Sequence, residues 1–320
     1  MHIHEVIHNA GQGRAPDEAE RAALADWLLA DPSQVDFFGL TAGNAPAAVA
    51  WRLEHLPPVC RALAEGPLDV AGYAERVEPS AEAVFRVHLP LAQWLIAETE
   101  GGEERYLAAI AGVPAGGKSV FAALMARVVA ALEPPFGVVA VGLDGYHYPN
   151  AHLLAHPAPP GVLEPGVLKL YKGTQFTFDT ARLVADLRRL RSVREAVALP
   201  AYDRTLHDPV EGRIRACPAD RLVLVEGNYL LCREGGWAGV PDLFDLRLFV
   251  DLPLGANREP MLARHMRGGR SRADAERHYE RVDLPNATVV ACTRAEADVV
   301  VRLDASYGVV GVVRGSGPRG

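Results

Sequence analysis

The stretch Gly112-Val113-Pro114-Ala115-Gly116-Gly117-Lys118-Ser119 decides the fold, because it fills the pattern GxxxxGK(S/T) of a phosphate-binding loop. An apolar run at 106–111 precedes it and predicts a buried strand, and residues 119–132 follow with helical spacing and no breaker. A strand, a glycine-rich turn and a helix start surround an anion with backbone N–H groups and the positive helix end. The alternative is a glycine-rich turn with an incidental lysine; the flanking strand and helix favour phosphate binding.

The residue types in this loop predict a nucleotide site. Glycines are needed where a side chain would fill the space of the phosphate oxygens and where φ is positive. We expect Lys118 to reach the β- and γ-phosphates, and the Ser119 hydroxyl to ligate Mg²⁺. The predicted cofactors are therefore ATP and Mg²⁺. The nucleotide-binding residues predicted in this segment are Gly112, Pro114, Ala115, Gly116, Gly117, Lys118, Ser119 and Val120.

Composition narrows the class of protein. The 320 residues are 49% hydrophobic and 23% charged, as in an ordinary globular protein. A net charge of −7 argues against nucleic acid or an anionic membrane as a partner. No run has the length of a signal peptide core or a membrane span, and the four cysteines are scattered, which predicts a cytoplasmic protein with reduced thiols. The histidine-containing start of the chain is expected to be a frayed or edge-strand terminus.

The chain divides into two parts. Residues 1–103 are predicted to be a helical extension without a catalytic motif, with helices at 17–29, 47–64 and 80–99. Residues 104–320 alternate strand and helix, which predicts an α/β kinase domain with a three-layer parallel-sheet P-loop fold. The predicted strands are 106–111, 136–143, 196–199, 221–226, 246–250 and 298–303. The predicted helices are 119–132, 179–191, 254–267 and 271–282, and residues 152–169 are predicted to be a surface loop.

Polar residues follow two of these strands, at the sheet edge where parallel α/β proteins bind ligands. Asp144 comes after the strand 136–143, where it can face the γ-phosphate and accept a proton from an acceptor hydroxyl. Tyr146, His147 and Tyr148 follow it as candidate substrate contacts; an Asp-Gly turn with packed aromatics is the alternative. Glu226 ends the strand 221–226, as the acid of a Walker B element does, and is the second predicted metal ligand.

Two further segments carry charge or aromatic rings. Tyr202, Arg204 and His207 would form one wall for a polar metabolite; the alternative is a surface hairpin with its own ion pair. Arg264 and Arg267 stand three residues apart on a predicted helix, so both can face one side of it. On a mobile lid they would offset charge on the transferring phosphoryl group, and Arg264 is the predicted catalytic arginine. Ordinary solvated arginines are the alternative.

Together these motifs resemble the P-loop kinase superfamily of uridine kinases, phosphoribulokinases and type I pantothenate kinases, over roughly residues 105 to 305. The segments 171–179, 225–231 and 283–287 look most like the fructokinase-like (uridine kinase-like) branch. The segment 87–95 instead resembles the part that precedes the catalytic domain of type I pantothenate kinases.

The resemblance implies roles for single residues. It gives Lys118 and Ser119 to phosphate and Mg²⁺, Asp144 to the base, Glu226 to the metal, and Arg264 to the lid. Tyr202 and His207 match substrate-contacting positions of uridine kinases, and Asn286 resembles a substrate-contacting asparagine of pantothenate kinases. Lys172 is a further expected substrate contact. The chain departs from uridine kinases at Pro209, where they carry arginine. It departs from pantothenate kinases at Arg204, where they carry histidine, and at His265 and Gly268, where they carry lid aromatics.

The sequence therefore predicts an ATP-dependent kinase that phosphorylates a hydroxyl of a small polar metabolite. A sugar or nucleoside is the leading acceptor, and pantothenate is the alternative. A P-loop ATPase or nucleotide switch without a small-molecule acceptor is the second alternative. By family resemblance, the protein is expected to be a homo-oligomer, a dimer.

Overall fold

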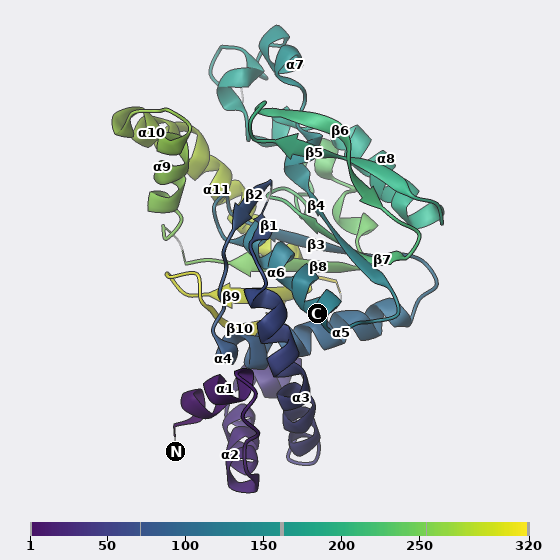
Figure 1. Cartoon of the computed structure of the whole chain (residues 1–320). Coiled ribbons are helices and arrows are strands. Elements are labelled where there is room, and N and C mark those ends of the chain that lie inside the picture. Colours follow the sequence, from purple (N-terminus) through teal and green to yellow (C-terminus); the bar gives the residue numbers. More distant parts are fainter. Residues whose placement is uncertain (1, 71, 161–162, 254, 319–320) are drawn as a thin grey trace.

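A six-stranded sheet forms the centre of the protein (Figure 1). The computed structural model describes residues 2–70, 72–160, 163–253 and 255–318. Five strands are parallel, and the edge strand β10 is antiparallel to β9. In sheet order the strands are β10 (Val309–Arg314), β9 (Val299–Leu303), β8 (Leu246–Asp251), β3 (Tyr106–Gly112), β7 (Asp220–Glu226) and β4 (Gly137–Gly142). The prediction of an α/β fold with a largely parallel sheet is confirmed.

The sheet is buried on both faces, which explains the continuous apolar strands of the sequence. On β3, Ala108 and Ile110 face one apolar cluster, whereas Leu107 and Ala109 face the other. Helix α6 (Lys118–Ala131) covers the first face together with the amino-terminal extension, and α8 (Thr180–Ser192) covers the second. The remaining helices of the kinase part are α7 (Asn150–Ala155), α9 (Arg258–Arg267), α10 (Arg272–His278) and α11 (Leu284–Cys292).

The extension is helical and shares its core with the sheet. Its helices are α1 (Ile3–Gly11), α2 (Glu18–Leu29), α3 (Ala45–Ala64), α4 (Ala81–Ala83) and α5 (Leu89–Glu100). Val84–His88 is a π-helical turn, so the helix predicted at 80–99 is interrupted. The terminus expected to fray or form an edge strand is helix α1 instead, because Val6 and Ile7 are buried against the rest of the extension. The boundary at 103 and 104 stays a prediction, since one apolar cluster runs across it.

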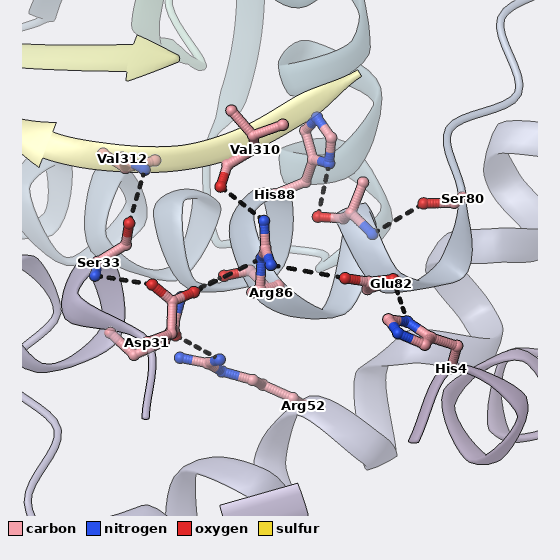
Figure 2. A network of polar contacts seen from close by, with 12 residues as sticks. His4, Asp31, Ser33, Arg52, Ser80, Glu82, Arg86, His88, Val310 and Val312 are labelled. Carbon is pink, nitrogen blue, oxygen red and sulfur yellow. Dashed lines mark hydrogen bonds and ion pairs between the residues drawn. The ribbon is translucent and has the colours of Figure 1, made fainter. Parts of the chain in front are cut away.

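Polar contacts also dock the extension on the edge strand β10 (Figure 2). The Arg86 guanidinium donates to the carbonyl oxygen of Val310 at 2.6 Å and lies 3.6 Å from the Asp31 carboxylate. The backbone N–H of Val312 donates to the Ser33 hydroxyl at 3.3 Å. The edge of the sheet is therefore covered rather than left free to pair.

One predicted strand lies outside the central sheet. Residues 196–199 were expected to join the parallel sheet, but β5 (Val197–Asp203) pairs antiparallel with β6 (Asp208–Ala216) in a separate hairpin. Its last residues are only partly buried, as in a strand with one solvated face. The hairpin lies beyond the end of β4 in Figure 1.

Among the described residues, no helix combines the length and the apolarity that crossing a membrane requires.

Three predicted segments differ in their limits. The loop predicted at 152–169 begins inside α7, and its residues 161 and 162 lie outside the described residues. The helix predicted at 254–267 begins at Arg258, and residue 254 also lies outside the described residues. The helix predicted at 271–282 is α10 followed by a π-helical turn, Tyr279–Asp283.

Candidate active site

The phosphate-binding loop joins the end of β3 to the start of α6. Gly117 has φ of 85° and Ala115 has φ of 53°, so the loop turns through the left-handed region twice. A Cβ at Gly116 would lie 2.7 Å from the carbonyl oxygen of Val113, and one at Gly112 would lie 2.8 Å from that of Val250. The chain therefore forms a tight turn that side chains would distort, as a backbone cradle for an anion requires.

Two side chains from distant segments brace this loop from behind. The Asn257 amide donates to the carbonyl oxygen of Pro114 at 3.0 Å, and the Tyr307 hydroxyl donates to that of Ala115 at 2.8 Å. Both acceptors are carbonyls of the loop itself, so these bonds fix its conformation. Sequence reasoning missed both residues. Asn257 directly precedes the arginine-containing helix, which is a weak signal, and Tyr307 lies in the turn between β9 and β10, where no motif marks it.

Charge is buried where the loop meets the end of β7. Burial lowers the pKa of the Lys118 ammonium, against the opposing effect of the Glu226 and Asp144 carboxylates. Burial likewise raises the pKa of the Glu226 carboxyl, which Lys118 and a hydrogen bond with Ser119 partly offset. Both groups are thus more costly to ionise than in water. A bound polyphosphate beside Lys118 and a cation beside Ser119 and Glu226 would relieve that cost, so these residues fit both groups.

Asp144 lies two residues beyond the end of β4, among basic side chains. Its Oδ2 lies 2.7 Å from Nη2 of Arg204 and 4.0 Å from Nη2 of Arg264, and its Oδ1 lies 3.9 Å from Nδ1 of His147. Burial would raise the pKa of Asp144, but these three groups and Lys118 together bring it well below its ordinary value. The carboxylate is therefore ionised throughout the neutral range. Its ion pair with Arg204 joins two residues that the sequence assigned to different motifs.

The hairpin β5–β6 forms a wall beside Asp144. The Tyr202 ring has two cationic neighbours, the Arg204 guanidinium at 4.9 Å and the Lys172 ammonium at 4.8 Å from its centroid. Lys172 also donates to Asn150 Oδ1 and to the carbonyl oxygen of His207, both at 2.9 Å. Burial lowers the pKa of Lys172 to about 8. Cationic and aromatic groups thus gather next to the carboxylate.

The other predicted substrate contacts that follow Asp144 in the sequence pack against neighbouring side chains. Tyr146 is 2% exposed and belongs to the second apolar cluster, and burial raises the pKa of its hydroxyl. His147 is buried with its ring 3.9 Å from that of Phe178, and burial lowers its pKa to about 4. Tyr148 stacks on His152 of α7 at 4.2 Å. These positions favour a packing role over substrate contact for Tyr146 and for the His147 ring.

The structure separates the remaining candidates. Arg264 of α9 lies 4.0 Å from Asp144, whereas Arg267 lines an open hollow with Glu259 of α9 and Arg272 of α10. The His207 side chain is exposed at a backbone φ of 53°, so its carbonyl, rather than its ring, is the group that meets Lys172. Asn286 is partly buried near the start of α11.

A second cluster has the composition of a metal site. Ligand atoms of His265 on α9, His278 on α10 and Asp283 just before α11 lie within 4.8 Å of one another. His265 Nε2 already contacts Asp283 Oδ2 at 2.6 Å, and Arg270 lies 3.4 Å from the other ring nitrogen of His265. The His–Asp contact and the neighbouring guanidinium are consistent with a structural ion pair that ties α9 to the turn before α11.

Comparison with known proteins identifies the family. The Escherichia coli (strain K12) protein YggC is 31% identical to this chain over 238 residues, which cover 74% of this chain and 94% of YggC. The chain belongs to the P-loop kinase superfamily of uridine kinases, phosphoribulokinases and pantothenate kinases. The match with YggC covers 74% of this P-loop kinase, which is more than residues 104–320 make up. The similarity therefore extends into the amino-terminal extension. No family model matches the chain.

Two further comparisons concern proteins with named activities. The pantothenate kinase of Sorangium cellulosum is 29% identical over 287 residues, covering 77% of this chain and 89% of that enzyme. A solved structure described as a candidate fructose transport system kinase, from Silicibacter sp. TM1040, has 26% identity and a TM-score of 0.58, covering 67% of this chain and 98% of that one. This protein is therefore an ATP-dependent P-loop kinase of small molecules.

Proposed function

We propose that this kinase transfers the γ-phosphoryl group of ATP to a hydroxyl of a neutral polar metabolite, a sugar or a nucleoside. One observation carries the proposal: an ionised Asp144 lies at the end of β4, within reach of the lid arginine Arg264 and electrostatically coupled to Lys118. A nucleotide switch needs a positioned water at this point and no aromatic wall. Here Tyr202 and Lys172 line the approach to the carboxylate, which favours an acceptor molecule.

Each residue then has a chemical role. The loop N–H groups and Lys118 bind the phosphates, and Arg264 offsets the charge that develops on the transferring group. Asp144 orients the acceptor hydroxyl and takes its proton as the phosphorus–oxygen bond forms. Because its pKa is low, proton transfer is expected late in the step, as a loose transition state allows. Ser119 and Glu226 would hold Mg²⁺, which supplies charge neutralisation at the phosphates when bound.

Pantothenate is the second candidate acceptor. The relationship with the Sorangium cellulosum pantothenate kinase and the segment 87–95 support it. Pantothenate carries a carboxylate, which fructose and uridine lack. Its binding would need a cationic side chain that is not already paired with an acid. Arg204 is paired with Asp144, and Lys172 with two neutral oxygens, so Lys172 is the group that could serve it.

An ADP-release screen with D-fructose, uridine and pantothenate tests the proposal, with Asp144→Asn as the inactive control. We expect fructose or uridine to stimulate ADP release in the wild type and not in Asp144→Asn. Stimulation by pantothenate alone would select the second candidate. If the wild type releases ADP at a rate that no acceptor changes, the protein is an ATPase or a nucleotide switch.

The dimer and the cytoplasmic location are part of the same proposal. The family resemblance supports a dimer, and the scattered cysteines support a reducing compartment; the described cysteines are all free thiols. Light scattering coupled to gel filtration measures the mass directly. A single species at 34.4 kDa would rule out the dimer at the concentration used.

A further inference from the structure

A small hairpin of the amino-terminal extension reaches the wall beside Asp144. Its strands are β1 (Leu68–Val70) and β2 (Tyr73–Glu75), which pair antiparallel. A Cβ on Gly72 would lie 3.5 Å from the carbonyl oxygen of Tyr202 and 3.6 Å from Cγ of Arg204. The extension, in which the sequence shows no catalytic motif, therefore approaches two residues of the proposed acceptor site.

The hairpin is anchored, so this contact is fixed by the fold. Leu68 and Val70 are 2% and 7% exposed and belong to the core cluster that includes α6. The carboxylate of Asp69 accepts a hydrogen bond from the backbone N–H of Gly72 at 2.8 Å, and φ of 86° at Gly72 suits a glycine. Arg127 of α6 donates to the carbonyl oxygen of Ala62 at 2.9 Å, just ahead of the hairpin.

Tyr73 projects from β2, which pairs with the anchored strand β1, and is 52% exposed. The Arg204 guanidinium lies 5.7 Å from the centroid of the Tyr73 ring and 4.9 Å from that of Tyr202. The same guanidinium donates to Asp144 at 2.7 Å. Two aromatic rings on separate hairpins therefore flank the arginine that holds the carboxylate. A guanidinium near aromatic faces loses freedom that it would otherwise keep in water.

We propose that Tyr73, on the β1–β2 hairpin, is a positioning residue of the acceptor site, which orients Arg204 and through it Asp144. This inference rests on the proposed function of Asp144. The extension then takes part in catalysis through geometry. A chain that lacked the hairpin would keep its phosphate loop and lose the alignment of its acceptor end.

Three substitutions test this. Tyr73→Ala removes the ring, Tyr73→Phe keeps it, and Glu75→Ala alters an exposed residue on the same strand as a matched control. With the acceptor identified by the screen of fructose, uridine and pantothenate, Tyr73→Ala should lower kcat/KM for that acceptor by about two- to fivefold, the range of one exposed cation–π contact. The KM for MgATP should stay unchanged. Tyr73→Phe and Glu75→Ala should match the wild type.

A second measurement does not require activity. The hydrogen-exchange rate of the Arg204 guanidinium, followed by arginine side-chain NMR, should rise in Tyr73→Ala and stay unchanged in Tyr73→Phe. Equal exchange in Tyr73→Ala and the wild type would overturn the inference, whether or not any acceptor is phosphorylated. An equal loss of kcat/KM in Glu75→Ala would overturn it as well, because the hairpin would then act only through its fold. If no acceptor is phosphorylated but exchange rises as expected, the proposed function fails and the Tyr73–Arg204 contact stands.

Discussion

The two ends of the proposed site are built differently. The phosphate end is one continuous stretch of eight residues, and its binding groups are mainly backbone N–H groups held by the turn from β3 to α6. The acceptor end collects side chains from separate segments, among them Asp144, Lys172, Tyr202 and Arg204, with the extension hairpin behind them. Backbone geometry confers anion binding of one kind, whereas an assembly of side chains can be altered one residue at a time. For this reason a sequence motif predicts the nucleotide but not the acceptor.

The largest expected effect separates the two ends directly. Asp144→Asn keeps the shape of the side chain and removes its capacity to accept a proton. Acceptor-dependent turnover should fall by ~10²–10⁴, or roughly 3–5 kcal/mol of transition-state stabilisation. MgATP affinity should change little, because Lys118, Ser119 and Glu226 are intact. Steady-state kinetics and nucleotide titration measure the two quantities.

Asp203→Asn is the matched control, because Asp203 ends β5 directly before Arg204 but pairs with Arg213 at 3.5 Å. It should be nearly as active as the wild type. Normal turnover in Asp144→Asn would reduce Asp144 to a turn residue. A parallel loss of nucleotide and Mg²⁺ affinity would move it into the metal shell and blur the distinction between the two ends.

The second prediction concerns a substitution that disrupts the phosphate end alone. In Gly116→Ala the new Cβ would meet the Val113 carbonyl oxygen at 2.7 Å, so the loop must shift away from its cradle shape. Wild-type protein should gain about 2.7 kcal/mol of stability at an ATP concentration of 100 Kd. Most of the resulting increase in melting temperature should vanish in Gly116→Ala, as it should in Lys118→Ala.

Gly239→Ala is the control for this substitution, since a Cβ there has open space. It should respond to MgATP as the wild type does. A wild type that shows no thermal response to MgATP, ADP or GTP would contradict nucleotide binding at this loop altogether.

The same difference explains how far the sequence could be interpreted. Periodicity and the loop motif predicted five strands of the central sheet and the helix α6, because each depends on local residue pattern. The strand at 196–199 was placed in the wrong sheet, since a local apolar pattern does not specify its partner strand. Tyr73 and Tyr307 carried no signal, because their contacts join residues more than a hundred positions apart. The pairing of Arg204 with Asp144 likewise depends on the fold.

The third prediction asks how the extension contributes away from the hairpin. Helices α1–α3 lie at the opposite end of the molecule from α10 and α7 (Figure 1). Arg86→Ala removes a hydrogen bond to Val310 and an ion pair with Asp31, and should lower the free energy of unfolding by about 1–3 kcal/mol. Chemical denaturation measures this loss.

Below the melting temperature, kcat and both KM values should be unchanged in Arg86→Ala, in contrast to Tyr73→Ala. Substitution of the exposed Arg61 should alter neither stability nor kinetics. A change in acceptor KM caused by Arg86→Ala would show that the whole extension, and not its hairpin alone, shapes the acceptor end.

The most specific prediction concerns the ion pair between Asp144 and Arg204, and its expected effect lies in the pH profile. Burial raises the pKa of Asp144 and its cationic neighbours lower it, so Arg204→Gln should raise that pKa from its depressed value. A carboxylate with a depressed folded-state pKa stays ionised as pH falls, and loses its function and its stabilising contribution only below the ordinary range. Wild-type kcat/KM should therefore show no acidic limb from this group down to about pH 5. In Arg204→Gln the acidic limb should move to higher pH, while the KM for MgATP stays constant. Arg213→Gln, an exposed arginine of the same hairpin, should leave the profile unchanged. A profile that is identical in all three proteins would contradict this assignment, because the remaining neighbours of Asp144 would then be enough to keep it ionised without Arg204.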